Sequence, residues 1–183
     1  MEHKQLSEEL IYHGRVFDLV RSHVQLPDGR EHAYDLVKHR GAVVILPVDN
    51  AGKIWFVQQY RIGAEHVLLE LPAGVTEAEE APEICARREV QEEIGMAAGR
   101  LEKLGEFYMV PGYSTEKLTA YLATDLRDSS LPMDEDEFIE PIGIPIQRVF
   151  EMVRAGEIQD GKTLATLLLA QDQLMRIAGT TTE

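Results

Sequence analysis

The sequence has little of several features that define common protein classes. It contains one cysteine, Cys85, so no intramolecular disulfide can form and no oxidising compartment is required. The longest apolar stretch, residues 164–170, is far shorter than the roughly 18 residues that a membrane span needs. No apolar segment follows a basic head at the start of the chain, as it would in a secretory signal. We therefore expect a cytoplasmic protein that does not bind to or cross a membrane.

Basic residues are also scarce. The chain has 18 Lys and Arg against 32 Asp and Glu, a net charge of −14, which disfavours non-specific binding to nucleic acid or anionic lipid. If the ligand is itself an anion, a divalent cation is the obvious way to screen the repulsion. The 183 residues, of which 44% are hydrophobic, suit one globular domain with a real core and room for a small appendage.

The first part of the chain has the patterns of β-strands. Residues 16–26 and 31–38 flank the turn signal Pro27-Asp28-Gly29 and predict a hairpin. Further strands are expected at residues 42–48, a short apolar run rich in β-branched residues, and at residues 54–59.

Helices and strands are mixed in the remainder. A helix is predicted over residues 81–94, with Pro82 in its first turn and Gly95 placed to end it. The other expected segments are strands at 101–109 and 118–123, an acidic loop at 125–140, and helices at 146–153 and 162–178. This order predicts an α/β (α+β) sandwich over residues 41–183, with an N-terminal antiparallel β module over residues 1–40.

The predicted helix at 81–94 places its acidic residues badly for stability. Glu89 and Glu93 lie one turn apart, at the helix end where the dipole already carries partial negative charge. Arg88 can pair with Glu92, which leaves Glu89 and Glu93 uncompensated. From this helix alone two interpretations stand: a solvated acidic face, or a site for a hard cation such as Mg²⁺ or Mn²⁺, which prefers oxygen ligands.

The spacing around this helix favours the cation site. Seven fixed positions and two apolar ones match the motif of the Nudix hydrolase family, which the chain thereby resembles. The matching residues are Gly74, Glu80, Arg88, Glu89, Val90, Glu92, Glu93, Gly95 and Met96.

The resemblance implies a fold and a chemistry. Nudix enzymes have an α/β/α sandwich with a mixed sheet, and they hydrolyse a nucleoside diphosphate linked to a second group with the help of Mg²⁺ or Mn²⁺. By resemblance, Glu89, Glu93 and the backbone carbonyl of Ala73 are the metal ligands, and Glu92 is a metal or water ligand. Arg88 would orient the glutamates, and Gly74 would allow a tight turn. The number of metal ions stays open.

Features outside the motif resemble the ADP-ribose pyrophosphatase group. Pro111 lies 15 residues after Met96, where that group has a characteristic proline, and residues 111–116 are similar to its substrate-binding segment. The implied reaction converts ADP-ribose to AMP and ribose 5-phosphate. The implied assembly is a homodimer formed by the N-terminal module. Hydrolysis of GDP-mannose or another nucleotide sugar is the alternative, and a non-catalytic ADP-ribose-sensing domain is an alternative of another class.

The resemblance also implies substrate contacts. Arg61 would bind the diphosphate or a ribose, Glu116 the terminal ribose, and Asp35 would lie near the base. The alternatives are a surface arginine, a loop-stabilising glutamate and an aspartate too short for the contact. The remaining candidates are Val75 and Met109, which could line the nucleoside pocket or belong to the core, and Gly112 in the substrate-binding segment.

The acidic run at residues 134–140 contains five carboxylates and is either a solvated loop or the source of the general base. The resemblance ranks Glu137 first and Glu135 second for that role, with Glu116 also considered. Two other features are expected to be structural: Cys85 within the helix, and an apolar stripe of Leu164, Leu167 and Leu168.

Overall fold

The computed structural model describes residues 2–133 and 138–180. Its elements are β1 (Lys4–His13), β2 (Phe17–Gln25), β3 (Glu31–His39), β4 (Ala42–Pro47), β5 (Lys53–Arg61), β6 (His66–Glu70), β7 (Ala73–Val75), α1 (Pro82–Ile94), β8 (Met96–Tyr108), β9 (Lys117–Asp128), β10 (Glu140–Pro145), α2 (Ile146–Ala155), α3 (Gly161–Leu169) and α4 (Gln171–Thr180). The chain forms two compact units. The N-terminal unit comprises Met1–Gly41 and Phe107–Lys117, and the main unit comprises Ala42–Glu106 and Leu118–Glu183.

The N-terminal unit contains an antiparallel sheet in the order β1-β2-β3. The predicted turn joins β2 to β3, and Gly29 adopts a left-handed φ of 89° there, which a glycine accepts without strain. Strand β1 was not predicted from the sequence. All ten of its residues are exposed, so it lacks the alternation of apolar and polar residues that reveals a half-buried strand.

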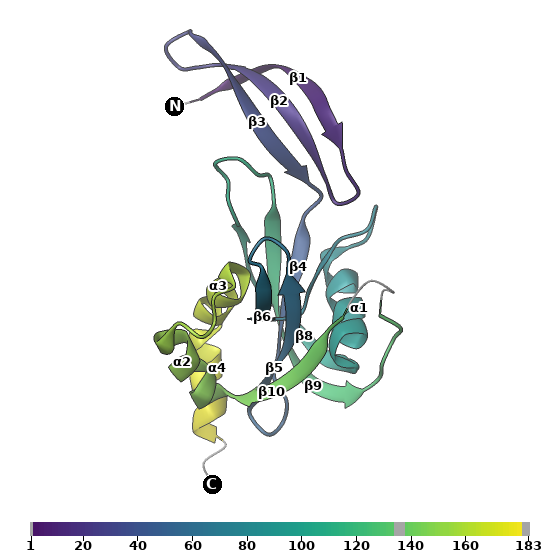
Figure 1. The fold of residues 1–183 in the computed structure, drawn as a ribbon. Helices are drawn as coiled ribbons and strands as arrows, with labels where there is room; N and C mark the ends of the chain where they lie inside the picture. Colours follow the sequence, from purple (N-terminus) through teal and green to yellow (C-terminus); the bar gives the residue numbers. More distant parts are fainter. Residues whose placement is uncertain (1, 134–137, 181–183) are drawn as a thin grey trace. The chain divides into compact units, whose positions relative to one another are not determined.

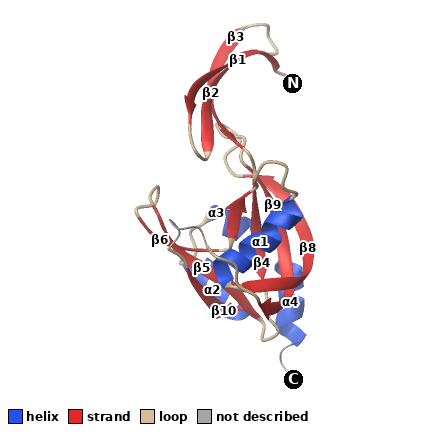
Figure 2. Ribbon diagram, turned by 90° about the vertical axis from the view of Figure 1, so that its right-hand side faces the viewer, coloured by secondary structure: helices blue, strands red, loops and turns tan. Residues whose placement is uncertain are grey.

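The main unit is built on two sheets with helices on both sides. One sheet has the order β7-β4-β9-β8, with β4 parallel to β9 and antiparallel to β7; the other has the order β10-β5-β6. All six residues of β4 are buried, as expected for a central strand covered on both faces. Helix α1 lies on one side of the strands and α2, α3 and α4 on the other (Figure 1). The α/β fold with a mixed sheet is thus confirmed (Figure 2).

Three predicted segments are wrong in detail. The strand expected at residues 101–109 begins five residues earlier, because β8 starts at Met96. The acidic loop expected at residues 125–140 is shorter, because β9 continues to Asp128 and β10 begins at Glu140. The single helix expected at residues 162–178 is two helices, α3 and α4, separated at Ala170. Leu168, expected to pack in the core, is 71% exposed, while Leu167 is buried. The described helices include none that is long and apolar enough to span a membrane.

Helix α1 ends where the sequence predicts. Its first residue is Pro82, whose missing N–H would have no partner in the first turn. Gly95 closes it in the left-handed conformation, and its N–H bonds to the carbonyl of Val90. One face of the helix is buried in the main core, through Cys85, Ala86, Val90 and Ile94. Glu89 and Glu93 are buried with that face.

Candidate active site

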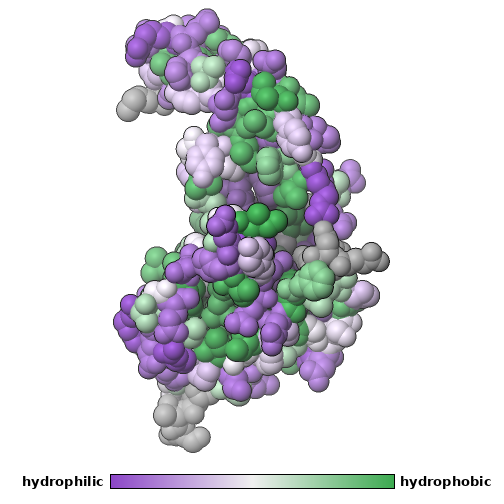
Figure 3. All heavy atoms as spheres, viewed as in Figure 1, coloured by the Kyte–Doolittle hydropathy of each residue, from purple (hydrophilic) through white to green (hydrophobic). Residues whose placement is uncertain are grey.

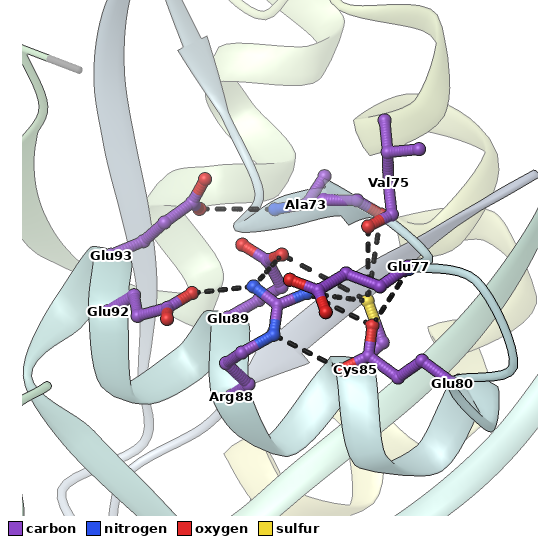
Figure 4. A network of polar contacts seen from close by, with 10 residues as sticks. Ala73, Val75, Glu77, Glu80, Cys85, Arg88, Glu89, Glu92 and Glu93 are labelled. Carbon is purple, nitrogen blue, oxygen red and sulfur yellow. Dashed lines mark hydrogen bonds and ion pairs between the residues drawn. The ribbon is translucent and has the colours of Figure 1, made fainter. Parts of the chain in front are cut away.

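Two carboxylates of α1 are directed at strand β7. Glu89 is 7% exposed and Glu93 is 4% exposed. The backbone N–H of Ala73 donates a hydrogen bond to Oε2 of Glu93 at 3.1 Å (Figure 4). Burying two carboxylates is costly unless they have polar partners. Their placement against a backbone segment therefore indicates a site rather than a solvated face.

Gly74 is required by close packing rather than by a turn. It lies within β7, paired with Val43 of β4, and a Cβ atom added to it would sit 1.9 Å from Oε1 of Glu89. Its φ is not in the left-handed region. The tight turn expected from the sequence is therefore wrong; the glycine provides the space into which Glu89 extends.

Arg88 binds three carboxylates at once. Its Nη1 atom donates to Glu89 and to Glu92, both at 2.7 Å, while Nε and Nη2 donate to the two oxygens of Glu80 at 3.1 Å (Figure 4). The expectation that Glu89 is uncompensated is therefore wrong, because the single guanidinium reaches beyond Glu92. The hydrogen bond from Arg88 keeps the pKa of Glu80 below its ordinary value, and Glu80 in turn raises the pKa of Arg88.

Cys85 lies beneath this network and is fully buried. Its Sγ atom is 3.7 Å from the carbonyl oxygen of Val75 and 4.0 Å from Oε1 of Glu89. Burial raises the pKa of the Cys85 thiol, and the negative charge of Glu89 raises it further. A thiol held protonated is a poor nucleophile, which agrees with the packing role expected of the buried Cys85.

The donor set suits a hard divalent cation. The carboxylates of Glu89, Glu92 and Glu93 and the carbonyl of Ala73 offer only oxygen, the ligand that Mg²⁺ and Mn²⁺ prefer. Within residues 2–133 and 138–180, no three acidic, histidine or cysteine side chains converge closely enough to hold a metal as they stand. In Figure 4 the guanidinium of Arg88 is bonded to Glu89 and Glu92. The residue types thus fit a divalent cation, and the single positive charge of Arg88 is shared among Glu80, Glu89 and Glu92.

Arg61 is paired with a residue that the sequence analysis missed. Its Nε and Nη2 atoms each donate to Glu70 at 2.7 Å, and Lys162 of α3 also donates to Glu70. The Glu70 side chain is 1% exposed. Burial raises its pKa, but the bonds from Arg61 and the charge of Lys162 outweigh burial and leave that pKa below its ordinary value. A glutamate within the apolar run 67–71 is the signal that could have predicted such a partner.

Two predicted substrate residues have contrasting surroundings. Val75 ends β7 in the main unit and is 37% exposed, so it is available for contact. Asp35 lies on β3 in the N-terminal unit, where Arg21 binds both of its oxygens at 2.8 and 3.2 Å. The hydrogen bond from Arg21 lowers the pKa of Asp35.

The other predicted substrate residues belong to the 107–117 segment of the N-terminal unit. The N–H of Met109 donates to the carbonyl of Glu116 at 3.2 Å, so the structure brings these two together. Gly112 has open space where a side chain would begin. Glu135 and Glu137, the two candidates for general base, lie outside the described residues.

Comparison with known proteins assigns this arrangement to a family. A model of the NUDIX domain matches residues 38–167. The matched range includes α1, β7, Arg61 and Lys162.

Several relatives match over nearly the whole chain. An ADP-ribose pyrophosphatase of Bacillus subtilis is 38% identical over 165 residues, which is 89% of each protein. A methanol dehydrogenase activator of Bacillus methanolicus is 34% identical over 94% of each. A GDP-mannose pyrophosphatase of an Enterobacter strain is 33% identical, over 89% of this chain and 86% of that protein. Relatives whose sequences are similarly close to this chain are thus named for different activities.

The fold has a counterpart of known structure. A crystal structure of an ADP compounds hydrolase superposes with a TM-score of 0.85, covering 96% of this chain and 95% of the other, at 24% identity. That likeness concerns the fold. The family-model match and the relatives above 30% identity go further: the chain belongs to the Nudix family.

Proposed function

We propose that the chain is a pyrophosphohydrolase that cleaves the diphosphate of a nucleoside diphosphate sugar with water, and that ADP-ribose is its preferred substrate. The products would be AMP and ribose 5-phosphate. The observation that carries this proposal is the pair of buried carboxylates, Glu89 and Glu93, directed from α1 at the Ala73–Gly74 backbone.

The chain's own residues would prepare this site for a divalent cation. Glu89, Glu93 and the Ala73 carbonyl would hold it, with Glu92 as a further metal or water ligand. A cation bound there would neutralise phosphate oxygens and lower the pKa of a water molecule. Mg²⁺ is the proposed ion, and Mn²⁺ has the same ligand preference. Arg88, which contacts Glu89 and Glu92 at 2.7 Å, would orient these carboxylates.

A carboxylate near the reacting water would accept its proton. We propose Glu137 for this role and Glu135 as the second candidate; both lie in the acidic run of residues 134–140. A glutamate suits the task if neighbouring charges raise its pKa toward the working pH.

Several side chains are proposed as substrate contacts. Arg61 would bind the diphosphate, because its planar guanidinium suits bidentate contact with phosphate oxygens and its side chain stays 42% exposed beside Glu70. The remaining candidates for the nucleoside and terminal ribose are Asp35, Val75, Met109, Gly112 and Glu116.

The choice of ADP-ribose is supported by the names of relatives. ADP-ribose pyrophosphatases of Bacillus subtilis and Mycobacterium tuberculosis are 38% and 36% identical to this chain. GDP-mannose pyrophosphatases follow at 33–34%, which makes GDP-mannose the second candidate. A non-catalytic ADP-ribose sensor is the candidate of another class, and the complete set of motif carboxylates argues against it.

Turnover of a substrate panel tests the proposal. We would measure kcat/KM with Mg²⁺ for ADP-ribose, GDP-mannose, UDP-glucose and NADH, using Glu93→Gln as the inactive control. The expected result is that ADP-ribose leads by about tenfold or more, a difference of about 1.4 kcal/mol in transition-state binding. A lead for GDP-mannose would support the second candidate. Tight binding of ADP-ribose without turnover would support the sensor.

We also propose a homodimer formed through residues 1–40. Only Val20 and Ser22 of the sheet β1-β2-β3 are buried, whereas apolar side chains of β1 such as Leu10 and Tyr12 are each 58% exposed. A partner that covered these side chains would bury apolar surface that the sheet by itself leaves exposed. Apolar and hydrophilic side chains are interspersed on its surface (Figure 3).

A further inference from the structure

The first turn of α3 reaches the backbone segment that faces the buried glutamates. Thr163 is fully buried, and its Oγ1 atom accepts a hydrogen bond from the N–H of Leu71 at 2.8 Å. The same hydroxyl donates to Oδ2 of Asp160 at 2.6 Å. The hydroxyl proton and one of the two lone pairs are thus used, which fixes the rotation of the hydroxyl.

The residues around Thr163 are fixed in turn. Asp160 caps α3 by accepting from the N–H of Thr163 at 3.0 Å, and it also pairs with Lys162 at 3.1 Å. Lys162 is bonded to the buried Glu70, the residue immediately before Leu71. The turn therefore contacts the chain at two successive residues, through a side chain at Glu70 and through the backbone at Leu71.

The other end of the same segment lies against the proposed metal ligands. Ala73, two residues after Leu71, donates its N–H to Glu93. Gly74, the next residue, leaves the space that Glu89 occupies. Between Leu71 and Ala73 the carbonyl of Pro72 accepts from the N–H of Ile45 in β4 at 2.8 Å. Leu71 and the proposed metal ligands are therefore separated by a very short stretch of chain.

We propose that Thr163 is a positioning residue that sets the affinity of the carboxylate site for its divalent cation by fixing residues 71–74. The inference rests on the proposed function and deepens it. It places a determinant of metal binding on α3, some 70 residues after the family motif ends at Met96. Replacing residues that orient the metal ligands without touching the metal commonly lowers metal affinity by 10–100-fold.

A matched pair of variants isolates this contact. Thr163→Val keeps the shape of the side chain but leaves the buried N–H of Leu71 without its acceptor, which costs the desolvation of that group. Thr166→Val makes the same chemical change one turn later, at an equally buried residue whose hydroxyl only donates to the carbonyl of Lys162. Thr163→Ser keeps the hydroxyl and removes only the methyl group.

The probe is Mn²⁺ alone, titrated into the full chain without substrate and followed by the electron paramagnetic resonance signal of free Mn²⁺. We expect Thr163→Val to raise the Kd for Mn²⁺ by about tenfold. Thr166→Val and Thr163→Ser should stay within about twofold of the parent. The Mg²⁺ concentration that half-saturates turnover of ADP-ribose should rise in parallel for Thr163→Val, with little change in KM for ADP-ribose at saturating Mg²⁺.

The outcomes separate this inference from the proposed function. A parent chain that binds no Mn²⁺ overturns both. If the parent binds Mn²⁺ and hydrolyses ADP-ribose but Thr163→Val binds Mn²⁺ as tightly, only the positioning role is overturned. Equal losses in Thr163→Val and Thr166→Val also overturn it, since a merely structural role would lower the melting temperature without discriminating between the two.

A milder variant keeps the test decisive if Thr163→Val does not fold. Asp160→Asn retains a good N-cap residue but weakens the acceptor of the Thr163 hydroxyl and the pair with Lys162. We expect it to raise the Kd for Mn²⁺ by about threefold. An unchanged Kd in this folded variant would overturn the proposal.

Discussion

At the scale of single residues, a substitution at Gly74 should affect turnover much more than the stability of the fold. A Cβ at this position would overlap Glu89, but the overlapping atoms are the far end of a flexible side chain that can move aside. We therefore expect Gly74→Ala to change the free energy of unfolding by less than about 1 kcal/mol. Turnover should fall by about 100-fold, because a carboxylate displaced by an ångström no longer serves the reaction. Chemical denaturation and steady-state kinetics measure the two effects.

Gly63→Ala is the control for that substitution. Gly63 lies in the loop between β5 and β6, and a Cβ there meets no atom within 4 Å. The variant should match the parent in both measurements. Parent-like turnover by Gly74→Ala would contradict the role assigned to this glycine.

Glu70 provides a second test, on the pH dependence of stability. Its pKa in the folded protein lies below the ordinary value of 4.5, so its ionised form stabilises the fold above that value and this contribution is lost as pH falls through the folded pKa. Glu70→Gln leaves Arg61 and Lys162 without their shared carboxylate. We expect a loss of about 3 kcal/mol at pH 7, at the low end for a broken buried pair because Arg61 can turn to solvent.

The difference between parent and Glu70→Gln should shrink as the pH falls from neutrality to well below 4.5, measured by urea unfolding with EDTA present. Glu157→Gln removes the carboxylate of an exposed pair with Arg148 and is the control. Its pH profile should follow that of the parent. A gap for Glu70→Gln that stays constant down to acid pH would show that the pKa of Glu70 is the same in the folded and unfolded states, which contradicts the lowered pKa.

At the scale of elements, local signals determine what could be predicted. The start and end of α1 depend on Pro82 and Gly95, both within the segment itself, and the predicted helix 81–94 differs from the observed one by one residue. Strand β1 has no such signal because its side chains are exposed on every side. The boundary at Ala170 between α3 and α4 was missed because neither glycine nor proline marks it.

The same distinction applies to the site. The pairing of Arg88 with Glu92 follows from helical spacing and was predicted, as was the cluster of carboxylates itself. The contacts of Glu70 with Lys162 and of Thr163 with Leu71 join residues 92 apart in sequence. No periodicity can indicate such partners, since they meet only when α3 packs beside the strands.

Helix α1 has carboxylates at positions that lower its stability, and a third prediction concerns one of them. Glu93 stands at the negative end of the helix, one turn after Glu89, and no basic residue occupies the last turn. In EDTA, Glu93→Gln should raise the free energy of unfolding by about 0.5 kcal/mol, because a misplaced charge is removed. Turnover with Mg²⁺ should fall by about 1000-fold or more, as for the loss of an essential group.

Glu83→Gln is the control, and its effect on the free energy of unfolding should have the opposite sign. Glu83 lies in the first turn of α1, where the helix dipole favours an acid, and it pairs with Arg87. Its replacement should lower stability slightly and leave turnover unchanged. A loss of more than about 1 kcal/mol in Glu93→Gln would mean that its bond to Ala73 outweighs the dipole.

At the scale of the whole molecule, charge and apolar surface point to different partners. The net charge of −14 repels an anionic substrate, and the cation proposed at the oxygen donors of α1 and Ala73 would screen that repulsion. The sheet β1-β2-β3 exposes apolar side chains instead, and β1 is a long edge strand. Exposed edges of this kind pair readily with another strand, so a second copy of the chain is the partner that we propose for it.

The dimer gives the last prediction. Leu10→Lys places a charge in the middle of β1, opposite Val20, and should weaken self-association by about tenfold or more because a buried ammonium lacks a partner. Leu168→Lys makes the same change on α3, at a leucine that is also exposed but lies in the main unit, and should leave association unchanged. Sedimentation equilibrium of the 20.6 kDa chain distinguishes the two. Equal dissociation constants for Leu10→Lys and the parent would exclude β1 from the interface, and a monomeric parent would exclude the dimer itself.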